Sequence, residues 1–360
     1  GRTGGGGLSK TDRSGAWGVW GHVTDEGDGA ELIASALIGT FHIVISAGQS
    51  IAVGSSIPQP FSRIPLMPDS GFSHALVQVP GSTSNIGPGF DCMGIALQVY
   101  NQIGVTRREG GGISPDHPMV AATAKRFFAQ ADAESFSFSW TIEGDVPISR
   151  GLGSSVTLRQ GILQGLNALL GEPLAKNVLF QLGSELEGHP DNASAGVYGG
   201  FTCTNATGTC LYHPVDSRLK FLVLVPEREL LTDVARQVLP EKLLHKDAVV
   251  SLGNACVITS AFATQQYEAL RGSFLDHLHQ PYRQVTNPGL TEVIAAAESA
   301  GALGGFLSGS GSSIACLAEE EGVPLRRIAE AMQKAYAVVG SSRLLVLGAD
   351  NEGAQTLTVS

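Results

Sequence analysis

From His74 onward, short apolar runs alternate with segments in which apolar residues recur at helical spacing. This alternation is typical of a chain that mixes β-strands and α-helices. The run HALVQVP, residues 74–80, predicts a first strand, and FLVLVP, residues 221–226, predicts a continuous buried strand. A glycine-rich strand, turn and strand is predicted over residues 301–319, and another short strand at RLLVLGA near the end. We find no long-period repeat, so the pattern indicates an α+β protein.

Two amphipathic helices are predicted one after the other in the middle of the chain. The first begins at Ser154 and stops at Gly171 and Pro173, and its apolar face carries Leu158, Ile162, Leu163, Leu166, Leu169 and Leu170. The second ends at Gly188 and Pro190, and its apolar residues are Leu174, Val178, Leu179, Leu182 and Leu186. Further helical segments are predicted around residues 233–238 and 246–270.

Residues 1–73 do not continue this pattern. They begin with a glycine-rich polar run, and the mixed apolar stretch at residues 32–53 is interrupted by polar residues and lacks a preceding basic segment. It is therefore a poor candidate for a transmembrane or secretory segment. We expect a disordered tail or an over-extended reading frame, with the functional chain starting near Met67. A targeting or regulatory extension is the alternative.

The composition is that of an ordinary globular protein, and 360 residues are enough for two domains. We place the boundary just before the buried strand, which gives domains of residues 74–214 and 215–360. The formal net charge of −10 argues against nucleic acid or an anionic membrane as a partner, because both attract a positive field. The five cysteines are scattered without the spacing of a metal site, as expected for reduced thiols in the cytosol.

The sharpest chemical feature is VPISRGLGSSVTLRQG, residues 146–161, where a glycine-rich turn leads directly into the first helix. Free N–H groups at a helix N-terminus bind anions, and Gly151 and Gly153 allow the backbone to approach a phosphate closely. The alternative interpretation is a simple helix N-cap formed by Ser154 or Ser155. The chain has neither the P-loop sequence nor the motifs of protein kinases, so any phosphate loop here is of another kind.

Three segments resemble motifs of the GHMP kinase superfamily and follow one another along the chain in the superfamily's order. VPGSTSNIGPGFDCMGIAL at residues 79–97 resembles the opening motif of the homoserine kinase family, PISRGLGSS at residues 147–155 resembles the ATP loop of these enzymes, and GGFLSGSGSS at residues 304–313 resembles the third, glycine-rich motif. ELEGHPDNASAGVYGGF, residues 185–201, also resembles the homoserine kinase version of its segment. The resemblance implies a two-domain α+β GHMP kinase fold, with an N-terminal ATP-loop domain and a ferredoxin-like C-terminal domain.

The same resemblance implies a set of site residues. For ATP they are Pro147, Ser149, Arg150, Gly151, Leu152, Gly153, Ser154 and Ser155. For the amino-acid substrate they are Asn85, Asp91, His189, Arg236, Arg283 and Gly309, with the two arginines gripping the carboxylate. Mg²⁺ is expected on Ser155 and on Glu187 or Glu185. Without this context, we would interpret each arginine as part of a surface ion pair.

The catalytic residues implied by the resemblance are Asp191 and Asn192. Asp191 is in about the place of the catalytic aspartate of mevalonate-type relatives, whereas homoserine kinases are thought to act without a general base, Asn192 polarising the hydroxyl. A turn or a helix cap is the structural alternative for both residues.

The family therefore implies a cytoplasmic enzyme, a homodimer, that phosphorylates L-homoserine with ATP in threonine biosynthesis. Another small alcohol as acceptor and a non-catalytic ligand sensor are the two alternatives.

Overall fold

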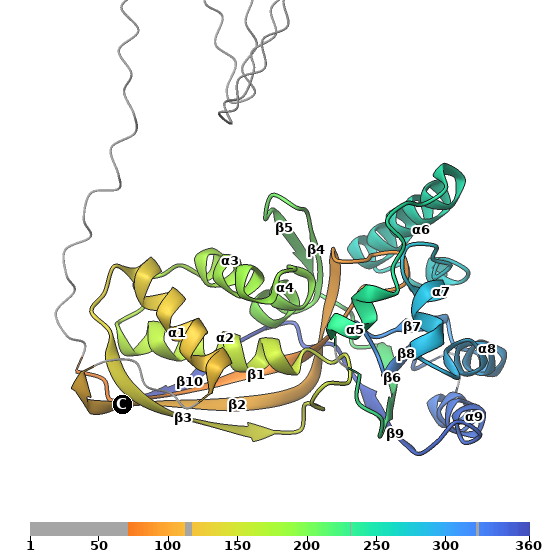
Figure 1. Ribbon diagram of the computed structural model, residues 1–360. Helices are drawn as coiled ribbons and strands as arrows, with labels where there is room; N and C mark the ends of the chain where they lie inside the picture. Colours follow the sequence, from red (N-terminus) through yellow and green to blue (C-terminus); the bar gives the residue numbers. More distant parts are fainter. Residues whose placement is uncertain (1–70, 112–116, 231, 322–323) are drawn as a thin grey trace, which may run out of the picture. The chain divides into compact units, whose positions relative to one another are not determined.

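The computed structural model describes residues 71–360, apart from 112–116, 231 and 322–323 (Figure 1). The interpretation of residues 1–73 as an extension lies outside the described residues, except for the last three positions. Within the described part, the elements form two antiparallel sheets, each covered by helices. The expected α+β class is confirmed.

The first sheet has the strand order β10-β1-β2-β4-β5, and β3 also pairs with β2. Its strands are β1 (His74–Ser84), β2 (Met93–Gly111), β3 (Phe136–Gly144), β4 (Phe201–Thr204), β5 (Cys210–His213) and β10 (Gln355–Val359). Four helices lie along one side of it in Figure 1: α1 (Pro118–Ala131), α2 (Ser154–Leu169), α3 (Lys176–Glu187) and α4 (Asp191–Tyr198). The predicted apolar face of α2 packs in this core, where Ile162, Leu163 and Leu166 are fully buried against Val77 and Val105 of the sheet.

The second sheet has the strand order β7-β8-β6-β9, again antiparallel. Its elements are β6 (Leu219–Pro226), α8 (Leu290–Ala300), β7 (Gly304–Leu307), β8 (Ile314–Glu319), α9 (Leu325–Tyr336) and β9 (Ser342–Leu347). This β-α-β-β-α-β order is that of a ferredoxin-like domain, as the family resemblance implied. The run predicted as a buried strand is the central strand β6, and Phe221, Leu222, Val223 and Leu224 are fully buried.

Between β6 and α8 the chain inserts a helical segment. It contains α5 (Thr232–Gln237), α6 (His245–Thr264), the short turns η1 (Tyr267–Leu270) and η2 (Gln284–Thr286), and α7 (Gln280–Arg283). The expected helix over residues 246–270 was too long, because Gln265 adopts the left-handed conformation and ends α6. Among the described helices, only α6 has the length and apolar composition of a membrane span, a test that helices of soluble proteins also pass.

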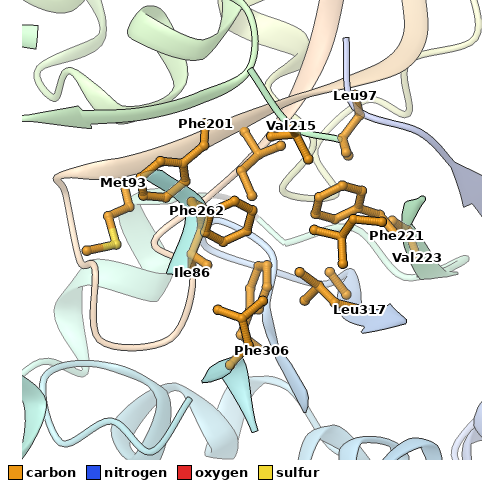
Figure 2. Close-up of a cluster of buried hydrophobic side chains, with 14 of the residues drawn as sticks. Ile86, Met93, Leu97, Phe201, Val215, Phe221, Val223, Phe262, Phe306 and Leu317 are labelled. Atoms are coloured by element: carbon orange, nitrogen blue, oxygen red, sulfur yellow. The ribbon is translucent and has the colours of Figure 1, made fainter. Parts of the chain in front are cut away.

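A third group of apolar side chains joins the two sheets (Figure 2). Met93 from β2 and Phe201 from β4 meet Phe221 of β6 and Phe306 of β7 in one buried cluster. Phe262 of α6 stacks on Phe201 with ring centroids 4.4 Å apart. The two sheets therefore share a continuous core, which fixes the segments that connect them.

The last strand returns to the first sheet. β10 pairs with β1, with Ala75 opposite Val359. A boundary between residues 214 and 215 separates the strands of the two sheets except for β10. The division into these two domains stays a prediction.

Candidate active site

The three glycine-rich segments meet through their backbones, although they are far apart in the sequence. Leu152 of the loop before α2 accepts a hydrogen bond from the N–H of Ser82 in β1, at 3.1 Å. The Ser308 hydroxyl, after β7, donates to the carbonyl of Gly151 at 2.7 Å and lies 2.8 Å from the Thr83 hydroxyl. These contacts fix the loop between the two sheets.

The N-terminus of α2 is open toward solvent-accessible space. Its N-cap is Gly153, in the left-handed conformation, and no side chain caps the helix. The alternative of a cap by Ser154 or Ser155 is therefore wrong, since both are already helical. The unpaired N–H groups of the first turn, together with the positive end of the helix dipole, are suited to an anion such as phosphate.

The other loop residues shape this site in different ways. Pro147 and Leu152 are buried and do not line the cavity described below, so their side chains support the loop and do not face a ligand. The Arg150 side chain turns to the second sheet, where it donates to the carbonyls of Pro226 at 2.9 Å and Glu227 at 2.6 Å. Ser149 lines the cavity. The loop therefore offers an anion mainly main-chain groups.

Glu187, and not Glu185, lies at the N-terminus of α2. The Ser155 hydroxyl donates to Oε2 of Glu187 at 2.9 Å. Nε of Arg159 lies 2.6 Å from Oε1 of Glu187, an ion pair without hydrogen-bond geometry, so this buried oxygen makes no hydrogen bond to any described group. Glu185 instead points to the surface, where it forms a bidentate pair with Arg126. A buried carboxylate oxygen without a hydrogen bond, beside a hydroxyl, is a donor set that fits Mg²⁺.

A cavity of about 400 Å³ opens at this loop. Its centre is formed by the loop and the start of α2. One end is polar and is lined by Asp91, His189, Asp191, Asn192, Arg236 and Arg283. The other end is mostly apolar and is lined by His117, Met119, Trp140, Ile142, Ile148 and Leu158.

The sequence patterns did not predict the apolar end of the cavity. His117 precedes α1 and Trp140 lies in β3, and their rings meet edge to face with centroids 5.7 Å apart. A mainly apolar recess with an aromatic ring, next to an anion site, suits the base of a nucleotide. The only sequence signal was an aromatic residue in an amphipathic strand, which is equally typical of a core.

At the polar end, Asp91 and Arg236 form a bidentate ion pair. The Nη1–Oδ2 distance is 3.0 Å and the Nη2–Oδ1 distance is 2.8 Å, and each side chain is about one-third exposed. Arg283 is deeply buried and donates to the carbonyls of Ala235 and Gly309 at 3.1 Å. Burial and the positive charge of Arg236 lower the pKa of Arg283 to about 10.

His189 and Asp191 form a second charged pair, with Nδ1 2.6 Å from Oδ1. Burial alone would lower the pKa of His189, but the hydrogen bond and charge of Asp191 raise it above its ordinary value. Burial would raise the pKa of Asp191, but His189 and further hydrogen bonds lower it. Asp191 also accepts from the backbone N–H of Asn192 at 2.8 Å, at the start of α4. A carboxylate with a lowered pKa is a weak proton acceptor at neutral pH.

The two asparagines of the predicted site are held in place by hydrogen bonds. Asn192 donates to the Ser84 hydroxyl at 2.8 Å and accepts from the Ser82 hydroxyl at 2.9 Å. Asn85 donates to the carbonyl of Gly309 at 2.9 Å and accepts from the N–H of Asp91 at 2.9 Å. Both amides line the cavity and orient the segments around them.

Two protein-family models match the chain. The model for the GHMP kinases N terminal domain matches residues 118–200, and the model for GHMP kinases C terminal matches residues 261–338. Homoserine kinase of Caldicellulosiruptor bescii is 35% identical over 297 residues, covering 79% of this chain and 97% of the relative.

Solved structures agree with this assignment. The crystal structure of homoserine kinase from Cytophaga hutchinsonii matches with a TM-score of 0.73 and 25% identity, over 81% of this chain and 98% of that one. Mevalonate kinase of Methanococcus jannaschii shares the fold, with a TM-score of 0.59 and 14% identity over 77% of this chain and 98% of that one. The chain belongs to the homoserine kinase family of the GHMP kinases.

Proposed function

We propose that the protein transfers the γ-phosphoryl group of ATP to the side-chain hydroxyl of L-homoserine, giving O-phospho-L-homoserine for threonine biosynthesis. The observation that carries this proposal is the order of groups along one cavity. An apolar recess, an open helix N-terminus and a cluster of opposite charges follow one another. They suit the base of ATP, its phosphates and a zwitterionic amino acid, respectively.

In this proposal, the phosphates of ATP bind the N–H groups at the start of α2, over Gly151 and Gly153. Ser155 and Glu187 would hold Mg²⁺, which neutralises charge on the phosphates when bound. The apolar end, with Trp140, takes the base. None of these roles requires a lysine in the loop.

The acceptor binds at the polar end. Its carboxylate meets Arg236 and Arg283, its ammonium meets Asp91, and its hydroxyl lies near His189 and Asn192. The hydroxyl oxygen forms a bond to the γ-phosphorus, the bond from that phosphorus to the bridging oxygen of ADP breaks, and the hydroxyl proton is released. The lowered pKa of Asp191 favours a mechanism that depends on positioning and charge rather than on a strong general base.

The proposal includes a cytoplasmic homodimer, as the family resemblance implies. Support for the dimer comes from α6, whose solvent-exposed side carries Val249, Leu252 and Val257. Light scattering on the full chain tests it: the wild type is expected at the mass of a dimer, and Leu252→Lys at that of a monomer. A monomeric wild type would contradict the dimer.

The test of the activity is an ATP-consumption assay with Mg²⁺ on the full chain, with L-homoserine, L-threonine, L-serine, mevalonate and galactose as separate acceptors. We expect turnover with homoserine that collapses in Arg283→Ala. Arg218→Ala is the matched control, since Arg218 pairs with Asp216 and Glu319 on the surface and should keep its activity. Turnover with mevalonate or galactose alone would overturn the acceptor, and ATP binding without turnover on any acceptor would favour a sensor.

A further inference from the structure

The two charged groups that the proposed function assigns to opposite ends of homoserine are bound to each other. Asp91 is assigned to the ammonium and Arg236 to the carboxylate, yet they form the bidentate pair described above. A bidentate pair satisfies both carboxylate oxygens and two guanidinium donors at once. Neither group can therefore give its full contact to a ligand while the pair is closed.

Arg283 has no such partner. Among the described residues, its hydrogen-bond partners are backbone carbonyls and the His279 ring, and none of the described carboxylates forms an ion pair with it. The Phe90 ring lies 5.1 Å from its guanidinium carbon and 5.5 Å from that of Arg236, so both cations contact one aromatic ring. Two neighbouring cations, of which only Arg236 is paired with the Asp91 carboxylate, favour the binding of a second carboxylate.

Asp91 also has an acidic neighbour. Ligand atoms of Asp91, His189 and Asp191 all lie within 4.8 Å of one another. If Asp91 lost Arg236 without gaining another cation, its charge would face that of Asp191 at short range, which costs free energy. The ion pair with Arg236 therefore prevents this repulsion.

Building on the proposed function, we infer that the Asp91–Arg236 pair selects zwitterionic acceptors by exchange of partners. A bound amino acid breaks the pair and replaces it with two new ones, its ammonium on Asp91 and its carboxylate on Arg236 and Arg283. A hydroxy acid without an ammonium can reach Arg236 only by leaving Asp91 unpaired beside Asp191. An amino alcohol can reach Asp91 only by displacing it from Arg236, and it brings no carboxylate to replace that ion pair.

This exchange differs from simple contact in one measurable respect. With independent contacts, the affinity losses from removing the ammonium and the carboxylate add up. With exchange, a ligand that carries one charge opens the pair without replacing it, so removing either charge costs nearly as much as removing both. A ligand with neither charge leaves the pair closed.

The experiment measures dissociation constants of four ligands for the full chain by calorimetry, with a non-hydrolysable ATP analogue and Mg²⁺ present. The ligands are L-homoserine, γ-hydroxybutyrate without the ammonium, homoserinol without the carboxylate, and the linear butanediol with neither. We expect homoserine to bind at least tenfold more tightly than any of the others, and both single-charge ligands to bind within about threefold of the butanediol. Additive losses would overturn the inference, whereas absence of homoserine binding would overturn the proposed function itself.

A variant of Asp91 provides a second test of the exchange. Asp91→Asn removes the carboxylate charge that pairs with Arg236 while keeping the shape of the side chain, so γ-hydroxybutyrate should bind about tenfold more tightly than to the wild type, and homoserine less tightly. Glu319→Gln breaks the Arg218–Glu319 pair away from the cavity and should change neither affinity. If Asp91 were only a contact for the ammonium, Asp91→Asn would leave the affinity for γ-hydroxybutyrate unchanged, and the inference would fail.

Discussion

Gly151→Ala should separate the ATP loop from the third glycine-rich segment. Gly151 has φ +71°, and a Cβ atom there would lie 2.1 Å from the carbonyl oxygen of Ser308 and 2.9 Å from that of Gly311. Both are backbone atoms, so no side chain can rotate away. The two segments must move apart, and the Ser308–Gly151 hydrogen bond is lost.

The cost has two parts. Placing alanine in the left-handed conformation costs about 1–2 kcal/mol. The lost hydrogen bond of Ser308, together with that from the Ser313 N–H to the carbonyl of Arg150, adds about 2 kcal/mol. We therefore expect Gly151→Ala to lower the free energy of unfolding by about 3–4 kcal/mol.

Gly208→Ala is the matched control. Gly208 lies in the turn between β4 and β5 with φ +83°, and a Cβ atom there would meet nothing within 4 Å. This variant has the conformational cost alone, about 1–2 kcal/mol. The difference between the two variants in urea unfolding therefore measures the contact between the two loops.

Activity gives a second readout on the same pair of variants. A displacement of the loop by about 1 Å would lower kcat/KM for ATP by up to about a hundredfold, whereas Gly208→Ala should leave it unchanged. Equal stability and equal kcat/KM in the two variants would show that the backbone contact between the loops contributes nothing, and the reasoning would be refuted.

Other expected outcomes concern buried polar groups. Gln160→Met should raise the free energy of unfolding by about 1–3 kcal/mol in urea titrations, because both polar atoms of Gln160 are buried without a hydrogen-bond partner among the described residues. Glu187→Gln should weaken Mn²⁺ binding, measured by electron paramagnetic resonance, by about tenfold, and Glu185→Gln should not. His189→Gln should lower the free energy of unfolding by about 2 kcal/mol between pH 3.8 and 6.5, the ordinary pKa values of Asp191 and His189. This loss of stability should shrink as the pH rises through the raised pKa of His189. A loss that does not depend on pH would contradict the charged pair.

Local sequence patterns predicted the elements whose own residues carry the pattern of a strand or a helix. The strand at residues 74–80 follows from its local pattern, and the buried strand β6 from a continuous apolar run. The helices α2 and α3 follow from helical spacing and from glycine or proline stops. The contacts between distant segments had no local signal. The pairing of Ala75 with Val359 and the recess around Trp140 depend on where the chain folds back.

In the candidate site, too, local sequence patterns did not show which of two neighbouring residues faces the cavity. The sequence left Glu185 and Glu187 equal, because both lie in the last turn of one helix. The structure separates them, since Glu187 meets Ser155 and Arg159 while Glu185 meets Arg126 on the surface. A helix turns by about 100° per residue, so two positions that differ by two residues point to nearly opposite sides.

The net negative charge of the chain and the positions of three arginines both indicate that phosphate binding depends on local main-chain groups. A protein with a net charge of −10 cannot attract ATP by its overall field, so the phosphates must find local donors. Arg150, the arginine in the loop, is turned to backbone carbonyls of the second sheet, and Arg236 and Arg283 line the polar end of the cavity. In the proposed function, main-chain N–H groups at the start of α2 therefore bind the phosphates. Arg236 and Arg283 distinguish the acceptor in that proposal, so nucleotide binding and acceptor selection depend on different groups of one cavity.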